Sequence, residues 1–266
     1  MRYGAMNFPI MPVAEEISTF AALGFDYLEL AMDPPMAHFS QLRQGCGRIR
    51  SQLADAGMGL VCHLPTFVHT ADLTDRIRQA SVAEMLDALE TAGELGAEKV
   101  VFHPGLIRGM GSHVLPTAKA LAMESIAAIA DAGADAGLKL CIENMFPAYG
   151  AFFEPDEYAP IFSRFPQLGL TLDSGHANIR SPGGGRRLLA FLDRFADRLA
   201  HVHISDNSGK GDEHLPLGDG KVDFPALARR LAALGYDDTV TFEVFDPDRR
   251  RLAESRRQFE QMLTRR

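Results

Sequence analysis

The chain has 266 residues, of which 46% are hydrophobic, and its 27 basic and 35 acidic side chains give a formal net charge of −8. This balance excludes a generally basic nucleic-acid-binding protein and a polybasic membrane binder, although a local basic patch stays open. The three cysteines, Cys46, Cys62 and Cys141, are too few and too scattered for a disulfide framework or a cysteine-based zinc module.

The beginning of the chain carries no targeting signal of the secretory kind. MRYGAMNFPIMPVAEE lacks the basic start and apolar run of a signal peptide. No apolar stretch approaches the roughly 20 residues that a membrane-spanning helix needs. We therefore expect a cytoplasmic protein with reduced cysteines and no membrane contact. A homo-oligomer is compatible with this composition, although no residue pattern selects an oligomeric state.

One local pattern recurs along the chain: a helical stretch ends in glycine, and a β-branched, apolar run follows. It appears at Gly24, Gly57, Gly96, Gly137 and Gly235. Glycine adopts the left-handed conformation that closes a helix without strain. Helix, glycine and strand, repeated every ~40 residues in the first half of the chain, are typical of βα units and therefore of a parallel sheet.

Taken in chain order, the pattern predicts strands at residues 2–6, 26–31, 58–63, 99–103, 138–143, 168–173, 199–204 and 239–244. Helices are predicted at residues 13–23, 40–56, 74–95, 117–136, 156–163, 186–197, 224–234 and 249–264. This alternation favours an α/β fold, a closed (β/α)8 TIM barrel that forms a single domain over residues 1–266. A doubly wound open sheet is the alternative, but it rarely holds so many units. The glycine-rich segment 181–187 is predicted to be a flexible connection.

The residues that close the predicted strands carry the functional signal, because the active site of such a barrel lies at the carboxyl ends of its strands. Six consecutive strands end in a side chain that can bind a metal or transfer a proton: His63, His103, Glu143, Asp173, His203 and Glu243. Residues two apart share a face of a strand. Cys141 therefore points with Glu143, and Thr241 points with Glu243.

Three further candidates lie just beyond the strands. His176 follows Asp173 by three residues in LDSGHAN, and Asp212 and His214 are two apart in the loop 205–220. A mixture of histidine and carboxylate ligands suits Zn, Mn, Fe or Co better than Mg or Ca. Unpaired carboxylates buried together would cost several kcal/mol each, and a bound divalent cation removes that conflict. The nine residues are therefore candidate ligands of a divalent metal.

Most candidates also have a purely structural interpretation, but an unneutralised carboxylate at a strand end inside a barrel, as at Glu143 and Glu243, has few. A single histidine at a strand end, such as His63, is more often a hydrogen-bonded structural residue. Asp173 could cap a helix with His176 on the surface, and the loop pair Asp212 and His214 could be solvated. The remaining histidines are interpreted as structural or surface residues: His38, His69, His113 and His201.

Several segments together resemble the xylose isomerase-like TIM barrels, a superfamily that includes sugar and sugar-phosphate isomerases and epimerases and also endonuclease IV. They follow one another along nearly the whole chain: FHPG (102–105), IEN (142–144), LDSGHAN (172–178), HVHISDN (201–207), DEHLPLGDGKVDF (212–224) and FEV (242–244). The segments IEN and HLPLGDG resemble the corresponding motifs of the isomerase-like members. The resemblance implies a metal-dependent enzyme.

By resemblance to the single-metal epimerases, one divalent ion, usually Mn or a similar metal, would be held by Glu143, Asp173, His203 and Glu243. Glu143 and Glu243 would also act as the acid–base pair, and His176 would contact the substrate. Proton abstraction next to a sugar carbonyl builds an enediolate, which a Lewis acid stabilises, and two carboxylates on opposite sides of the sugar can move the proton.

By resemblance to endonuclease IV, all nine candidates match the ligands of a three-zinc cluster. The chain departs from the endonuclease where Glu143 is followed by Asn-Met-Phe and where the loop reads Asp-Glu-His without a central arginine. DNA binding needs several phosphate-neutralising cations on the rim. Arginines in or near the predicted loops at the carboxyl ends of the strands are Arg76, Arg78, Arg108, Arg180, Arg186 and Arg187.

The residues and the resemblance together favour a sugar or sugar-phosphate isomerase or epimerase that uses Mn or Zn, with one to three ions. Its partner would be a small sugar or sugar-phosphate substrate. The alternative is an endonuclease IV-like, zinc-dependent enzyme that cleaves DNA at abasic sites, and only this alternative makes DNA a partner. A catalytically silent metal- or sugar-binding barrel is a third interpretation.

Overall fold

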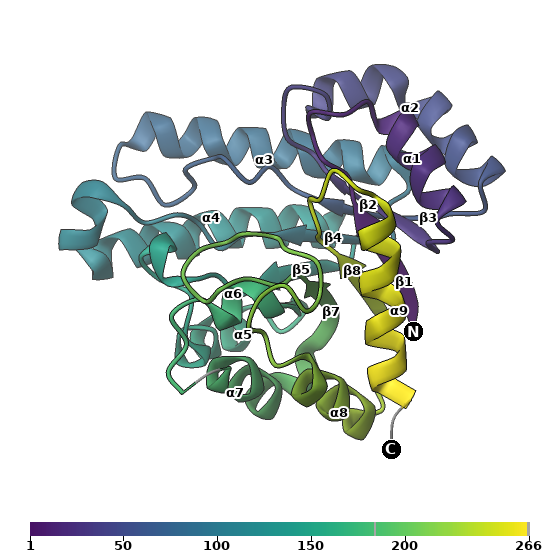
Figure 1. Ribbon diagram of the computed structural model, residues 1–266. Coiled ribbons are helices and arrows are strands. Elements are labelled where there is room, and N and C mark those ends of the chain that lie inside the picture. Colours follow the sequence, from purple (N-terminus) through teal and green to yellow (C-terminus); the bar gives the residue numbers. More distant parts are fainter. Residues whose placement is uncertain (184, 265–266) are drawn as a thin grey trace.

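The computed structural model describes residues 1–183 and 185–264, and its strands follow the predicted order. They are β1 (Arg2–Met6), β2 (Tyr27–Ala31), β3 (Gly59–His63), β4 (Lys99–Phe102), β5 (Leu140–Glu143), β6 (Gly169–Asp173), β7 (Leu199–Ile204) and β8 (Thr239–Phe242). Neighbouring strands are parallel, and β1 pairs with both β2 and β8, so the sheet closes. Figure 1 shows helices surrounding this barrel. The predicted (β/α)8 TIM barrel is therefore confirmed.

The helices between the strands are α1 (Val13–Ala22), α2 (Phe39–Asp55), α3 (Asp75–Leu95), α4 (Leu115–Asp135), α5 (Ala159–Arg164), α6 (Ser174–Asn178), α7 (Arg186–Phe195), α8 (Phe224–Leu234) and α9 (Arg250–Thr264). Short 3-10 helices are η1 (Gly109–His113), η2 (Pro147–Tyr149), η3 (Pro155–Glu157) and η4 (Ala196–Arg198). The predicted helix 156–163 is divided between η3 and α5. The sequence did not predict α6, because one turn of helix leaves no periodic pattern. Gly184, in the predicted flexible segment, lies outside the described residues.

The ends of helices and the faces of strands follow directly from local residue chemistry. α3 ends at Gly96 and α8 at Gly235, with φ values of 83° and 63° that glycine adopts without strain. In β2, Leu28 and Leu30 belong to the main core between the barrel and its helices, whereas Tyr27 belongs to a separate cluster inside the barrel. The outer face of the sheet, which packs against the helices, is therefore apolar, and the side chains on its inner face form a separate set.

The barrel interior changes character along its axis. Its lower part holds an apolar cluster of Tyr27, Val61, Val101, Cys141 and Ala200, with Lys99 and Thr239 as buried polar side chains at the amino ends of β4 and β8. Toward the carboxyl ends it becomes polar, and Glu29, His201 and Thr241 are completely buried. Branched apolar side chains usually fill the interior of a TIM barrel. Charged groups in this layer therefore point to a function at the carboxyl ends of the strands.

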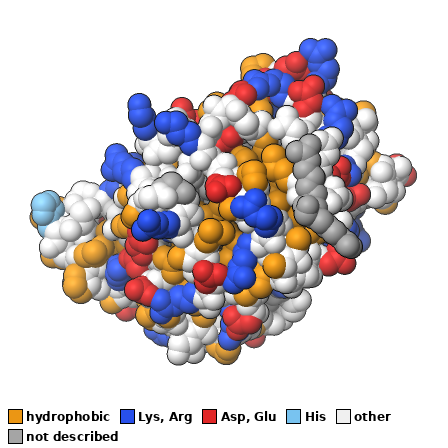
Figure 2. Space-filling view, turned by 60° about the horizontal axis from the view of Figure 1, so that its bottom comes forward, with side chains coloured by type: hydrophobic (Ala, Val, Ile, Leu, Met, Phe, Trp, Pro, Cys, Tyr) orange, Lys and Arg blue, Asp and Glu red, His pale blue; other side chains and the backbone are white. Residues whose placement is uncertain are grey.

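The outer surface carries charges of both signs. Figure 2, seen from the side of α7 and α8, shows Lys and Arg side chains interspersed with Asp and Glu and with apolar patches, as is typical of a solvated face. The first and last described elements, β1 and α9, lie on the same side of the molecule in Figure 1. Within residues 1–183 and 185–264, no helix is both long and apolar enough to cross a membrane.

Candidate metal centre

Three adjacent strands deliver the deepest group of candidates. Glu143, Asp173 and His203 lie on β5, β6 and β7, and all three are buried. The Nδ1 atom of His203 lies 3.5 Å from Glu143 Oε2, 3.7 Å from Asp173 Oδ2 and 3.5 Å from Glu243 Oε2. Glu243 directly follows β8, which ends slightly earlier than predicted. The four residues expected to hold a single ion therefore lie together, with the three carboxylates around one nitrogen atom.

Two neighbouring side chains hold the ends of β5 and β6 in place. The Asn144 side-chain amide donates to the carbonyl of Asp173 at 3.1 Å, and its Oδ1 accepts the Asp173 backbone N–H at 2.8 Å. The Tyr158 hydroxyl donates to the carbonyl of Glu143 at 2.6 Å. These bonds satisfy backbone groups that the closing strands leave free and hold the two carboxylates side by side. Neither Asn144 nor Tyr158 is among the predicted site residues.

Glu143 also connects to the two histidines at the ends of β3 and β4. His63 Nε2 and His103 Nε2 lie 3.2 and 3.5 Å from Glu143 Oε2. The other oxygen of this carboxylate, Oε1, lies 2.9 Å from His176 Nδ1. Glu143 is therefore shared between separate groups of candidate ligands.

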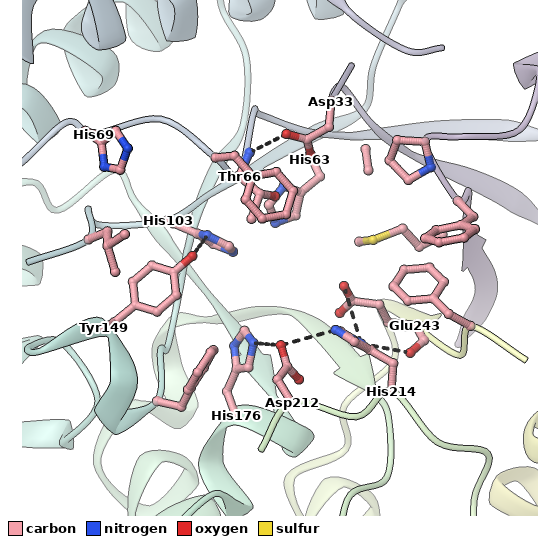
Figure 3. Close-up of a pocket in the computed structure, with 18 of the residues that line it drawn as sticks. Asp33, His63, Thr66, His69, His103, Tyr149, His176, Asp212, His214 and Glu243 are labelled. Atoms are coloured by element: carbon pink, nitrogen blue, oxygen red, sulfur yellow. Dashed lines mark hydrogen bonds and ion pairs between the residues drawn. The ribbon is translucent and has the colours of Figure 1, made fainter. Parts of the chain in front are cut away.

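A third group forms where α6 meets the loop after β7. Asp212 Oδ2 lies 3.3 Å from His176 Nε2 and 3.2 Å from His214 Nε2. His176 is buried here because Asp173 accepts its backbone N–H at 2.6 Å and so caps α6. Figure 3 shows the row His176, Asp212 and His214 across the cavity from His103. The cap role of Asp173 and its place in the cluster are thus compatible, and His176 is not on the surface.

All five histidines of the cluster are oriented in the same manner. One ring nitrogen of each bonds a backbone carbonyl, the Tyr149 hydroxyl or Glu29, and the other faces a carboxylate of the cluster: the bonds are His63 Nδ1 with Leu64 O (2.8 Å), His103 Nδ1 with Tyr149 Oη (3.0 Å), His176 Nδ1 with Asn144 O (2.9 Å), His203 Nε2 with Glu29 Oε1 (3.0 Å) and His214 Nδ1 with Glu243 O (3.3 Å). In His176, Nδ1 also lies 2.9 Å from Glu143 Oε1, while Nε2 faces Asp212. A carbonyl oxygen only accepts, so a nitrogen bonded to one carries the proton and the opposite nitrogen can offer a lone pair. Metal-ligating histidines adopt this arrangement.

The donor atoms of the cluster fit a divalent cation. His203 Nδ1, Asp173 Oδ2 and Asp212 Oδ1 are buried and, within the described part of the chain, have no hydrogen-bond partner, although buried polar atoms are normally satisfied. Among the described residues, four groups have ligand atoms within 4.8 Å of one another: His63, His103 and Glu143; Glu143, Asp173 and His176; Asp173, His203 and Glu243; and Glu29, His201 and His203. Nitrogen and carboxylate donors in this mixture suit zinc or manganese.

The buried carboxylates of the cluster also favour the binding of cations. Burial, together with the charges of Asp173 and Glu143, raises the pKa of Glu243 to about 7. Burial opposes ionisation of Glu143 as well, but His203 and His103 outweigh it and hold the pKa of Glu143 well below its usual range. With Glu143, Asp173, Asp212 and Glu243 all ionised and the five histidines neutral, as ligands of a metal would be, the cluster would carry a formal charge of −4. One divalent ion would leave −2 buried, two would neutralise the cluster, and three would make it attract an anion.

Six candidates line a cavity of about 450 Å³, which is a usual size for a small-molecule site: His63, His103, His176, Asp212, His214 and Glu243. Glu143, Asp173 and His203 are buried and are not among the residues that line it. Much of the remaining wall is aromatic, with Phe8 stacked on Phe245 at a centroid distance of 5.1 Å and with Phe67 and Phe146 nearby. The cavity therefore joins a polar floor to an apolar wall.

Glu29 on β2 is not among the predicted site residues, yet it touches the centre. Its carboxylate lies 2.8 Å from His201 Nε2 and 3.0 Å from His203 Nε2. A charged residue between Leu28 and Leu30 in a buried strand is the sequence signal that could have revealed it. His201, interpreted as structural or surface, is a buried structural residue.

The other histidines lie outside the cluster, as expected. His38 accepts from the Ser40 backbone N–H at the start of α2, and its Nε2 lies 2.7 Å from Glu84 Oε1. His69 is exposed at the edge of the cavity, and His113 is exposed at the end of η1. None of the three contributes to the groups of close ligand atoms found among the described residues.

Comparison with known proteins places this geometry in a family. The family model described as xylose isomerase-like TIM barrel matches residues 17–263. An uncharacterized protein of Methanocaldococcus jannaschii is 31% identical over 188 residues, which cover 69% of this chain and 64% of that protein. The chain therefore spans less than two thirds of that relative's length.

Solved structures of two kinds of enzyme share the fold. A D-tagatose 3-epimerase-like protein has a TM-score of 0.86 and 24% identity, covering 99% of this chain and 97% of its own. Endonuclease IV from Thermus thermophilus has a TM-score of 0.73 and 22% identity, covering 99% of both chains. At these identities the likeness shows the fold alone. Because the family model covers nearly the whole chain, this protein belongs to the xylose isomerase-like TIM-barrel family.

Proposed function

We propose that this chain is a divalent-metal-dependent phosphoester hydrolase that cleaves DNA at abasic sites. The observation that carries the proposal is the common orientation of the five histidines, each bonded to protein oxygen on one side and turned to the cluster on the other. A one-ion site uses only His203 among these histidines. The isomerase that the sequence favours therefore becomes the second candidate, and the endonuclease becomes the first.

The nine ligands divide into groups that would hold three ions. These are His63, His103 and Glu143; Glu143, Asp173, His203 and Glu243; and His176, Asp212 and His214. When bound, such ions generate a hydroxide nucleophile and stabilise the entering and leaving oxygens of an in-line displacement at phosphorus. Glu143 joins two of the groups, and Asp212 centres the third.

The mouth of the cavity suits a nucleic acid whose target sugar leaves the helix. Phe67 lines the cavity and is 83% exposed in the loop after β3, and Met110, 70% exposed in η1, lines an adjoining pocket. Apolar side chains exposed beside a pocket can enter a base stack and hold the duplex open around a flipped nucleotide. The cavity, near 450 Å³, has room for one sugar unit rather than a duplex.

The rim offers fewer free cations than the sequence suggests. Arg108 is exposed and lines the cavity, and Arg76 is exposed beside an adjoining pocket, so both can reach phosphates. Arg187, one of the arginines considered for DNA binding, is instead buried and lies 2.9 Å from Glu154. The proposal therefore expects a modest salt dependence of binding, set by few phosphate contacts.

Truncating Phe67 to alanine is expected to weaken cleavage of an abasic duplex roughly tenfold through KM, because stacking on a base contributes about 1–3 kcal/mol. Zinc content and melting temperature should not change, since Phe67 is exposed and away from the ligands. The measurement is steady-state cleavage with increasing duplex concentration. Leu234→Ala, at an exposed apolar position on α8, is the matched control. Equal KM values for the two variants would contradict this role.

The test of the proposed function combines a metal count with a cleavage assay. Elemental analysis of zinc-reconstituted protein should give three ions per chain, and this protein should incise a duplex at a synthetic abasic site but leave the intact duplex uncut. Chelator-treated protein should be inactive until zinc is restored. Protein that carries three ions and leaves the abasic duplex intact would overturn the nuclease assignment. A single ion per chain would overturn the proposal that the nine ligands bind three ions.

A sugar isomerase or epimerase is the second candidate, and one observation favours it. Glu143 and Glu243 both lie 3.5 Å from His203 Nδ1, so two carboxylates flank one ion position and could pass a proton across a sugar. Solvent deuterium exchange into a panel of ketoses, abolished by Glu243→Gln, would establish this activity. If neither exchange nor cleavage occurs in metal-loaded protein, the silent binding barrel becomes the preferred interpretation.

A further inference from the structure

Beneath the metal centre, a chain of hydrogen bonds runs along the barrel axis. Lys99 Nζ donates to Thr239 Oγ1 at 2.8 Å, and Thr239 Oγ1 lies 2.7 Å from His201 Nδ1. His201 Nε2 bonds Glu29 Oε2 at 2.8 Å, and His203 Nε2 bonds Glu29 Oε1 at 3.0 Å. We call Lys99, Thr239, His201 and Glu29 the polar column. It connects the lower barrel interior to one ligand of the centre.

The polar column is costly for the fold. Glu29 and His201 are fully buried, where an ionised carboxylate is destabilising by several kcal/mol unless it is paired and hydrogen-bonded. Each oxygen of Glu29 faces one imidazole nitrogen, so both acceptors are satisfied. An apolar side chain would fill this layer of a barrel at lower cost. The presence of a charged residue here therefore points to a function beyond packing.

The column reaches His203 on the side opposite to its ligands. His203 Nδ1 faces Glu143, Asp173 and Glu243 and has no hydrogen-bond partner among the described residues. With the ring proton on Nε2, where Glu29 accepts it, Nδ1 presents its lone pair to the three carboxylates. With the proton on Nδ1, the imidazole would be a donor toward them and could not bind a cation.

We propose that Glu29 is a positioning residue of the metal centre: by accepting the Nε2 proton of His203, it holds the ring in the tautomer and rotation that turn Nδ1 toward the cluster. A carboxylate behind a ligating histidine also increases the basicity of that ligand. His201 holds Glu29 in turn through its second oxygen. The inference rests on the proposed metal centre but not on which reaction the centre performs.

Glu29→Gln tests this role, because glutamine keeps the shape but offers one oxygen and places an NH2 group against the other imidazole. Zinc affinity, measured by competition with a chromophoric chelator, is expected to fall about 10- to 100-fold for one ion per chain. The visible absorption of the cobalt-substituted protein should change as well, because one ligand is then misoriented. Both readouts are independent of catalysis.

The matched control is Thr241→Val in the same buried layer. Thr241 Oγ1 bonds Tyr27 Oη at 2.8 Å and lies 3.3 Å from His201 Nε2, whereas His203 is bonded from below by Glu29. This variant should lose stability while its zinc affinity and cobalt spectrum stay at wild-type values. Glu29→Gln with a lowered melting temperature but wild-type zinc affinity and spectrum would overturn the inference, because Glu29 would then be only a packing residue.

A conservative variant keeps the test decisive if Glu29→Gln does not fold. Glu29→Asp retains the charge but shortens the reach, so it should bind the ion less tightly than wild type; unchanged affinity in a folded Glu29→Asp protein would overturn the positioning role. Failure of the proposed function looks different. Wild-type protein that binds no zinc would refute the metal centre itself, whereas inactive protein with normal zinc binding leaves the role of Glu29 intact.

Discussion

Replacing Glu143 with glutamine is expected to lower cleavage of an abasic duplex by about 10⁴-fold, the loss seen when the carboxylate of a catalytic triad is replaced by its amide. Glu143 Oε2 lies within 3.5 Å of ring nitrogens of His63, His103 and His203, so it is shared by two of the ligand groups. The amide removes the charge and one acceptor oxygen. The measurement is kcat/KM together with the zinc count, which should fall below three per chain.

The control for this substitution is Glu213→Gln. Glu213 lies between Asp212 and His214 but is exposed and accepts the Ser208 backbone N–H at 2.7 Å. The Glu213→Gln substitution removes a carboxylate from the same loop without changing any candidate ligand, so activity and zinc content should stay near wild type. Full cleavage and a full complement of zinc in Glu143→Gln protein would show that the cluster is not organised around this residue.

Removing the metal is expected to destabilise the fold by about 4 kcal/mol relative to protein in free zinc at a thousandfold excess over Kd. For a chain of this size, such a loss corresponds to a melting temperature lower by roughly 8 °C or more. The reason is the uncompensated negative charge of the buried carboxylates, which the histidines neutralise only by taking up protons. Calorimetry of chelator-dialysed protein during zinc titration measures the effect.

Magnesium provides the control for this second experiment. A centre with five imidazole ligands suits zinc or manganese, whereas magnesium prefers oxygen ligands, so magnesium should raise the melting temperature far less at equal concentration. Equal stabilisation by both ions would indicate binding to surface carboxylates rather than to the cluster. An unchanged melting temperature in zinc would contradict the metal centre.

Much of the architecture could be predicted from local patterns. A glycine that adopts positive φ, as Gly96 does at the end of α3, marks a helix end in any context, and an apolar β-branched run after it forms a strand. Because parallel strands bring their carboxyl ends to one face, His63 and Glu143 could be placed together although they are far apart in sequence. Short elements such as α6 escaped prediction because one turn has no periodicity.

Predicting the site required information about burial and packing that residue types do not give. The residue types at the strand ends indicated metal ligands, but several residues could equally be caps or surface groups. His176 and Asp173 show why: the cap and the candidate ligand are the same carboxylate, which only burial reveals. The arginine patch shows the opposite error, since Arg187 is buried against Glu154 by packing that no local pattern encodes.

The sequence by itself determined the alternation of strands and helices, the family, and the identity of nine candidate ligands, because these depend on residue type and short-range spacing. Only the tertiary structure decided how the imidazole rings are turned and what stands behind them. The bond from His203 to Glu29 joins β7 to β2 across the barrel, and its geometry exists only once the sheet has closed. Ring orientation, and with it the choice between one ion and several, is therefore a property of the fold.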